Sequence, residues 1–295
     1  MDGILGIGRG VKGESGIAAP QVMDVLSNNR LIGSKLYGIH LSRGKDSLND
    51  GELNFGEVNK DRFTGDLNWN SCVDNDAGFW EIAISDAGVN GKSLGITGRS
   101  AIIDTGTSFI LMPAPDALKI HSQIPGFKQD GETFSVPCDT TTIIQFSFNK
   151  QTYNISTADW RGLKVENGLC RSKIIGRQTF KESQWLVGDV FLKNVYSVFD
   201  FEGRRVGLGV KSAEGSLSAS ASASSSGTAR PSGGSATVGA AGTSQTAVVV
   251  AGGAGPTSAA GTQSQAGNAT GGAVRQSTSL SLLGLMVATS FSLLV

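Results

Sequence analysis

The composition of this sequence changes sharply after residue 211. Residues 1–211 carry nearly all of the charged residues and every Trp, Tyr and Cys. Residues 212–279 contain three charged residues, no aromatic residue, and mostly Ser, Gly, Ala and Thr. Such a segment cannot bury enough apolar surface to offset the entropy of ordering its chain. We therefore expect a folded part of roughly 210 residues, enough for one sizeable core or two small ones, followed by a disordered stalk.

Within the folded part, the apolar residues are mostly spaced as in β-strands. Four short runs are rich in β-branched or aromatic residues and lie between Gly, Asn and Asp clusters: residues 36–41, 81–84, 143–148 and 196–201. Two stretches favour helices, residues 20–29 and residues 113–123, each with a proline at its start. Short strands with few helices predict an all-β fold.

The charges balance, with 25 basic and 25 acidic side chains, so nothing in the charge indicates a nucleic-acid partner. The three cysteines and two histidines lack the spacing of zinc ligands, and we expect no metal and no cofactor. We place His40 on a strand and His121 on a helix surface, and find no Ser-His-Asp arrangement. So few cysteines, far apart, suit one disulfide in a secreted protein with one thiol left over.

The segment Ala101 to Ser108 reads Ala-Ile-Ile-Asp-Thr-Gly-Thr-Ser and carries the main candidate for chemistry. Asp104 would stand at the end of a buried strand, held by backbone N–H and hydroxyl donors, where Gly106 permits a tight turn. Taken alone, the tripeptide also fits an ordinary Asx-type turn. Two apolar-apolar-Gly segments, residues 4–6 and 186–188, echo each other at opposite ends of the folded part.

Several further segments are informative through the order and the spacing in which they follow one another along the chain. They are residues 2–8 (Asp-Gly-Ile-Leu-Gly-Ile-Gly), 63–69 (Phe-Thr-Gly-Asp-Leu-Asn-Trp), 79–82 (Phe-Trp-Glu-Ile), 185–192 (Trp-Leu-Val-Gly-Asp-Val-Phe-Leu) and 198–201 (Val-Phe-Asp-Phe). Together with Asp104 to Ser108 they resemble the pepsin family of aspartic endopeptidases. The resemblance implies a pepsin-like acid protease fold, of which this chain holds the C-terminal lobe and the end of the N-terminal lobe. Residues 1–34 would be the remnant of the N-terminal lobe, 35–43 the inter-lobe strand and 44–211 the C-terminal catalytic lobe.

The resemblance also implies an activity: a monomeric aspartic endopeptidase that acts on peptide or protein substrates. In that family two neighbouring aspartates share a proton, one activating water as a base and the other polarising the scissile carbonyl as an acid. Asp104 would be one of them, beside residues 186–188, with loop and substrate contacts from Thr105, Gly106, Thr107 and Ser108. No second Asp-Ser/Thr-Gly occurs in the sequence, and the family's flap would lie before Met1. We therefore expect an N-terminally truncated chain that is inactive alone.

Two covalent modifications are expected. The resemblance implies a disulfide between Cys138 and Cys170, which leaves Cys72 free or paired across the lobes rather than a nucleophile. Asn154-Ile155-Ser156 is an acceptor sequence for N-glycosylation.

The C-terminal end has the pattern of a GPI-attachment signal. Residues 280–295 are uncharged and mostly apolar, and these 16 residues fall short of the about 20 that a bilayer span needs. A polar spacer, residues 271–279, and small residues around Asn268 precede them, which makes Asn268 or nearby Gly267 the expected acceptor. The combination resembles the yapsin-type surface proteases of fungi and implies a glycosylated stalk on the extracellular side of the plasma membrane or in the cell wall. The N-terminus shows no signal peptide, which favours an incomplete chain.

Two other interpretations stay open. The chain could be a non-catalytic binding protein of the cell surface, a pseudo-protease, or it could come from a truncated gene model of an ordinary active enzyme. An upstream in-frame Asp-Thr/Ser-Gly and signal peptide would favour the enzyme. A dinucleotide-binding loop at Gly3, Gly6 and Gly8 is rejected because the spacing is reversed and no β-α-β unit accompanies it.

Overall fold

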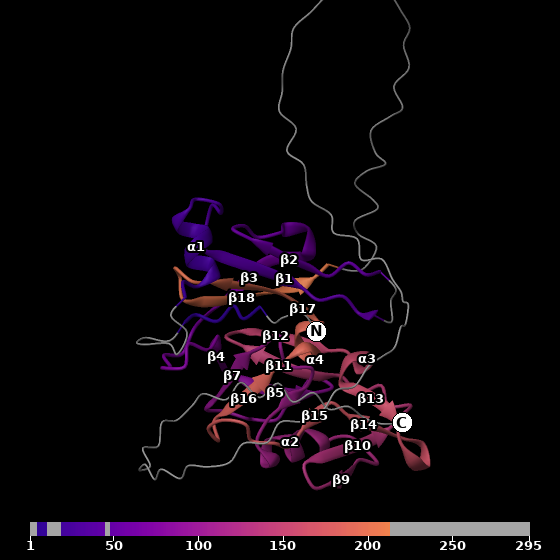
Figure 1. The fold of residues 1–295 in the computed structure, drawn as a ribbon. Helices are drawn as coiled ribbons and strands as arrows, with labels where there is room; N and C mark the ends of the chain where they lie inside the picture. The colour runs from indigo at the N-terminus through magenta and orange to yellow at the C-terminus, as the bar shows by residue number, and fades with distance from the viewer. Residues whose placement is uncertain (1–4, 11–18, 45–47, 213–295) are drawn as a thin grey trace, which may run out of the picture. The chain divides into compact units, whose positions relative to one another are not determined.

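Strands form most of the regular secondary structure in the computed structural model, which describes residues 5–10, 19–44 and 48–212 (Figure 1). These residues form four β-sheets with short helices between the strands, so the predicted all-β fold class is confirmed. The helices are α1 (Val22–Asn28), α2 (Ala114–His121), α3 (Thr157–Trp160) and α4 (Asp189–Leu192), with two 3₁₀ helices, η2 (Lys60–Arg62) and η3 (Glu166–Gly168).

The first sheet brings together strands from both ends of the described chain. It is antiparallel, in the order β2 (Glu52–Phe55), β1 (Leu36–His40), β17 (Val195–Asp200), β18 (Arg205–Lys211) and β3 (Phe63–Ser71). Every residue of β17 is buried. Tyr37 of β1 stacks on Phe199 of β17 with ring centroids 4.7 Å apart, and Trp80 packs edge-on against Phe199 at 5.4 Å. These aromatic contacts join the sheet to the residues that precede β4.

The second sheet holds the loop of interest. Its order is β15 (Ile174–Ile175), β8 (Ile110–Leu111), β16 (Gln184–Val187), β7 (Arg99–Ile103) and β4 (Glu81–Ile84). Strand β16 runs parallel to β7 on one side and antiparallel to β8 on the other. The loop from β7 to β8 must therefore pass the end of β16.

The other two sheets are antiparallel. One has the order β13 (Arg161–Lys164), β14 (Leu169–Ser172), β10 (Thr133–Pro137) and β9 (Lys128–Asp130). The other has the order β12 (Gln151–Ile155), β11 (Ile144–Phe148), β5 (Asp86–Val89) and β6 (Lys92–Ser93). Strand β11 shows why the sequence forms a sheet here: Ile144, Phe146 and Phe148 are fully buried, while the residues between them face outward, as the two-residue period requires.

Helix α2 corrects one sequence prediction. His121 was expected on a helix surface, but it is 0 % exposed. Its ring stacks on Phe134 with centroids 4.0 Å apart, Nε2 lies 2.9 Å from Ser172 Oγ, and Nδ1 lies 2.7 Å from the Ala117 carbonyl. Strands β10 and β14 cover this face of the helix, so both ring nitrogens find partners away from water. His40 does lie on a strand, β1, as predicted.

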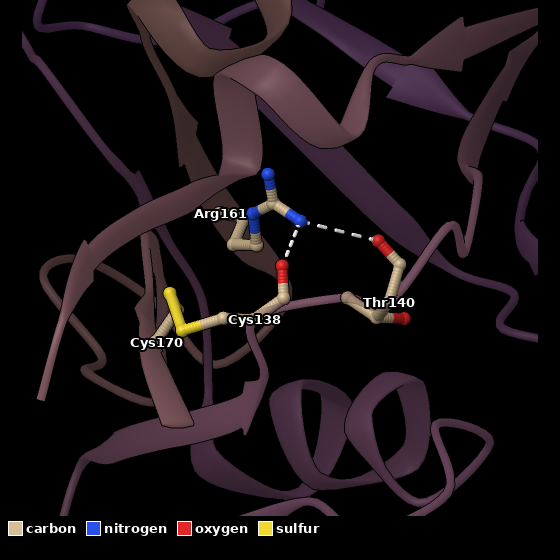
Figure 2. Close-up of a disulfide and its surroundings, with 4 residues drawn as sticks. All are labelled: Cys138, Thr140, Arg161 and Cys170. Atoms are coloured by element: carbon tan, nitrogen blue, oxygen red, sulfur yellow. Dashed lines mark hydrogen bonds between the residues drawn. A yellow bond between two sulfur atoms is a disulfide. The ribbon is translucent and has the colours of Figure 1, made fainter. Parts of the chain in front are cut away.

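The predicted disulfide is present. Cys138, just after β10, is joined to Cys170 in β14, at a sequence separation of 32 (Figure 2). Arg161 at the start of β13 donates hydrogen bonds to the carbonyl oxygens of Cys138 and Thr140 (Figure 2). The third cysteine, Cys72, is half-buried and free, and burial raises the pKa of its thiol to about 11.

The predicted stalk and GPI signal, with Asn268, lie outside the described residues, apart from Ser212. The same holds for Ile4 of the first apolar-apolar-Gly segment. Among the described residues, no helix is long and apolar enough to cross a membrane. The proposed division into lobes stays a prediction.

Candidate active site

Asp104 stands at the carboxyl end of β7 and is half-buried. Its Oδ1 accepts a hydrogen bond from the Gly106 backbone N–H at 2.9 Å, and its Oδ2 accepts one from the Thr107 hydroxyl at 2.5 Å. Hydrogen bonds of this kind to a carboxylate are about twice as strong as neutral ones. Within the part of the chain that the structure describes, the turn therefore fixes the orientation of the carboxylate without a hydrogen bond from a side chain distant in sequence.

The turn is threaded against the end of β16. The Asp104 N–H donates to the Val187 carbonyl at 3.1 Å, the Gly188 N–H to the Phe109 carbonyl at 3.0 Å, and the Asp189 N–H to the Thr107 carbonyl at 2.8 Å. A Cβ atom on Gly188 would lie 1.9 Å from the Thr107 carbonyl oxygen. Only glycine allows the two segments to approach this closely. The structure thus places the Asp104 turn directly beside residues 186–188.

The rest of the predicted loop is open to solvent. Thr105, Gly106 and Ser108 are exposed, Thr107 is half-buried, and the Phe109 side chain is 41 % exposed. The structure therefore brings the five predicted loop residues together beside an accessible surface. Cys170 and Asn154 lie in strands of the other sheets and Cys138 directly follows β10, so none of them takes part in this loop.

A second carboxylate lies near the loop, one that the sequence analysis did not single out. Asp189 follows Gly188 and is half-buried, and its Oδ1 has no hydrogen-bond partner in the described part of the chain. Burial raises the pKa of Asp189, and the negative charge of Asp104 raises it further, while Lys193 and Lys173 act in the opposite direction. Lys193 Nζ lies 3.9 Å from Asp189 Oδ2. In the sequence, the one signal that could have identified Asp189 is its position directly after the apolar-apolar-Gly segment 186–188.

The short segment 5–10 is held in place by side chains that the sequence analysis also missed. The Ile7 carbonyl accepts hydrogen bonds from the Tyr37 hydroxyl and from Trp80 Nε1, both at 2.9 Å. Burial raises the pKa of Tyr37, and the charge of Asp104 adds to this effect, so the hydroxyl stays a donor. Arg9 Nε binds the Phe79 carbonyl at 2.8 Å.

The first apolar-apolar-Gly segment, residues 4–6, differs from the second, residues 186–188, in its burial. Leu186 and Val187 belong to β16, and Val187 is fully buried. Leu5, by contrast, is 61 % exposed, and Gly6 is exposed as well. Within the residues that the structure describes, no acidic turn stands against Leu5 and Gly6 as Asp104 stands against 186–188.

Other chemistry is scarce in this part of the molecule. No three His, Cys, Asp or Glu side chains gather as a possible metal site among the residues described. His40 contacts Asp50, with Nε2 3.1 Å from Oδ2, and Asp50 also binds Arg62 at 3.1 Å. Burial and the charges of Lys211 and Arg62 lower the pKa of His40. These side chains form an ion-pair cluster at one end of the first sheet.

Comparison with known proteins gives a consistent answer over the folded part. The sequence profile described as eukaryotic aspartyl protease matches residues 1–211. The "Probable aspartic-type endopeptidase CTSD" of Arthroderma otae is 46 % identical over 213 residues, which are 72 % of this chain and 55 % of that protein. The "Aspartic-type endopeptidase ctsD" of Aspergillus fumigatus is 40 % identical over 214 residues, 72 % of this chain and 44 % of that protein.

The likeness extends beyond fungi. "Cathepsin E-B" of Xenopus laevis is 32 % identical over 214 residues, 70 % of this chain and 52 % of that protein. The chain thus spans about half the length of the curated relatives that it matches.

Proposed function

Because this chain belongs to the eukaryotic aspartyl protease family, we propose that it supplies one catalytic carboxylate, Asp104, to an aspartic endopeptidase. The main observation behind the proposal is that both carboxylate oxygens of Asp104 accept hydrogen bonds. Gly106 and Thr107 each donate to one of its oxygens, and the turn is locked against Val187 and Gly188. A carboxylate held in one orientation beside an accessible loop supports a role as a catalytic base.

The reaction needs a second carboxylate. Two aspartates at close range cannot both ionise, so they share one proton; one then takes a proton from water while the other donates to the scissile carbonyl oxygen. The titration belongs to the pair. This sequence contains a single Asp-Ser/Thr-Gly turn. We propose that the partner aspartate comes from outside the printed sequence, which is supported by the greater length of the relatives.

In this arrangement the chain would hold one wall of the substrate cleft. The exposed residues Thr105, Gly106 and Ser108 are the proposed contacts for a peptide substrate. The exposed Leu5 and Gly6 would receive the second acidic turn, as Val187 and Gly188 receive the first. The chain alone would be inactive, since losing one acid–base partner costs about 10²–10⁴-fold.

The experiment compares two proteins. One is this chain alone, and the other is this chain fused behind the upstream part of the Arthroderma otae relative, called here the reconstituted enzyme. We expect the reconstituted enzyme to cleave peptides at acidic pH and a transition-state mimic of the family to block the cleavage, and we expect no cleavage by the chain alone. Inhibitor-sensitive cleavage by the chain alone would overturn the need for a partner carboxylate. A folded but inactive reconstituted enzyme would favour a binding protein instead.

We also propose a location on the cell surface, in the manner of yapsin-type proteases. Its support is the sequence pattern of residues 280–295 and the small residues at Asn268. The Cys138–Cys170 disulfide adds support, because disulfides persist in oxidising compartments. Release of the protein from cells by a GPI-specific phospholipase would test the anchor, and Asn268→Gln is the matching variant.

A further inference from the structure

One sequence motif takes no part in the proposed function. Asn154-Ile155-Ser156 closes β12, which is an edge strand paired only with β11 among the described strands. Along β12, Tyr153 and Ile155 are buried, whereas Thr152 and Asn154 are exposed. The Asn154 side chain thus projects from the outer face of the sheet, away from the core.

The hydrogen bonds of Asn154 leave its amide nitrogen accessible. Its Oδ1 accepts a hydrogen bond from Gln145 Nε2 at 2.8 Å across the strand pair. Among the described residues, its Nδ2 makes no hydrogen bond, so the atom that would carry a sugar has no competing contact. Ser156 has a structural role of its own: its Oγ accepts from the Ala158 N–H at 3.3 Å and caps α3.

The surroundings leave room for a bulky substituent. The outer face beside Asn154 is formed by short polar side chains, such as Ser147 and Thr152, whose hydroxyls lie 2.7 Å apart. Gln145, Ser147 and Thr152 also line a shallow hollow of about 240 Å³ that extends toward Asp86 and Lys92. A group attached at Asn154 would meet this polar surface and solvent rather than the core, so the fold does not have to change to accept it.

We infer that Asn154 carries an N-linked oligosaccharide on the open face of the β12–β11 sheet. The co-reactant is a lipid-linked oligosaccharide diphosphate. Asn154 Nδ2 forms a bond to C1 of the first sugar, the bond from C1 to the diphosphate oxygen breaks, and the amide proton leaves with the diphosphate. This reaction takes place in the secretory pathway, where the Cys138–Cys170 disulfide would also form.

The test uses the full chain, expressed in a yeast host behind a signal peptide, recovered from both the cells and the medium, and digested with trypsin. The peptide of residues 151–161 contains Asn154 as its single asparagine, so its mass assigns the site. We expect the peptide to carry a hexosamine-based glycan, and enzymatic release of the glycan to convert Asn154 to Asp. Asn154→Gln should abolish the modification, whereas Ser156→Thr, which keeps both the acceptor sequence and the cap, should retain it.

Two controls keep the test decisive. Asn268-Ala269-Thr270 is a second acceptor sequence, so Asn268→Gln separates any signal from the C-terminal tail. Asp130→Asn with Glu132→Thr creates an acceptor in an exposed turn and should be modified when added to Asn154→Gln. An unmodified 151–161 peptide, from protein with an intact disulfide and a modified control acceptor, would overturn the inference. The result is independent of proteolytic activity.

Discussion

The Thr107 hydroxyl lies 2.5 Å from Asp104 Oδ2 and is the one side-chain donor that the described residues supply to this carboxylate. Removing it leaves Oδ2 without its hydrogen bond while Oδ1 keeps the Gly106 N–H. Hydrogen bonds to charged groups contribute about 1.5–3 kcal/mol. The two oxygens of Asp104 are therefore supported by different parts of one turn, and the parts can be tested separately.

Thr107→Val removes this donor and keeps the shape of the side chain. We expect kcat/KM of the reconstituted enzyme to fall by about 10- to 100-fold, the equivalent of one hydrogen bond to a charged group. Thr107→Ser keeps the hydroxyl and should stay close to the starting value. Peptide hydrolysis at acidic pH measures both. A Thr107→Val enzyme as active as the Thr107→Ser enzyme would show that this hydrogen bond contributes nothing to activity.

Gly188→Ala should destabilise the fold, because its Cβ would collide with the Thr107 carbonyl at 1.9 Å. We expect the free energy of unfolding to fall by roughly 2–4 kcal/mol, within the range for overpacking and strain. Thermal unfolding of the full chain measures the change. Gly44→Ala is the control, since a Cβ there meets nothing within 4 Å. A Tm for Gly188→Ala equal to that of the control would contradict the threaded arrangement.

The disulfide should contribute to stability through the loop that it closes. With a sequence separation of 32 between Cys138 and Cys170, the chain-entropy relation gives roughly 3–4 kcal/mol. The double variant Cys138→Ser with Cys170→Ser should lose about that amount in denaturant unfolding. Cys72→Ser should change stability much less, because Cys72 is free and half-buried. A larger effect at Cys72 would point to a partner that the described residues do not show.

His121 should make the fold sensitive to acid. Burial lowers its pKa to about 4, whereas an unfolded histidine titrates near pH 6.5. Between these values the unfolded state binds a proton that the folded state does not, so stability falls as the pH is lowered through this window. The full difference amounts to roughly 3 kcal/mol.

Unfolding free energies measured between pH 7 and pH 4 test this prediction. His121→Gln keeps polar contacts with Ala117 and Ser172 possible and removes the titrating group. We expect a lower stability at pH 7 but a shallower dependence on pH below 6.5. If the variant and the natural protein show the same slope, His121 does not control the acid sensitivity.

Sequence reasoning succeeded where structure is set locally. The apolar run before Asp104 predicted a buried strand, and Gly106 predicted the tight turn that the structure shows. The run 143–148, expected as a strand from its β-branched and aromatic residues, likewise forms β11 over residues 144–148. In each case the signal lies within a few residues, and local backbone preferences are enough to read it.

What the sequence could not predict depends on residues far apart in the chain. The Ile7 carbonyl is held by Tyr37 and Trp80, which lie 30 and 73 residues away. His121 was wrongly predicted to lie on a helix surface, because the sequence of the helix does not reveal that β10 and β14 pack over it. The pairing of Cys138 with Cys170 followed only from family resemblance, since three cysteines allow three pairings.

Replacing Asp104 by asparagine shows whether its carboxylate takes part in catalysis. Asp104→Asn in the reconstituted enzyme preserves the size of the side chain and removes the base. Asp130→Asn makes the same change at an exposed residue of β9. We expect Asp104→Asn to lower kcat by about 10²–10⁴-fold with unchanged thermal unfolding, and Asp130→Asn to keep full activity. An Asp104→Asn enzyme that cleaves peptides as fast as the Asp130→Asn enzyme would contradict a catalytic role for Asp104.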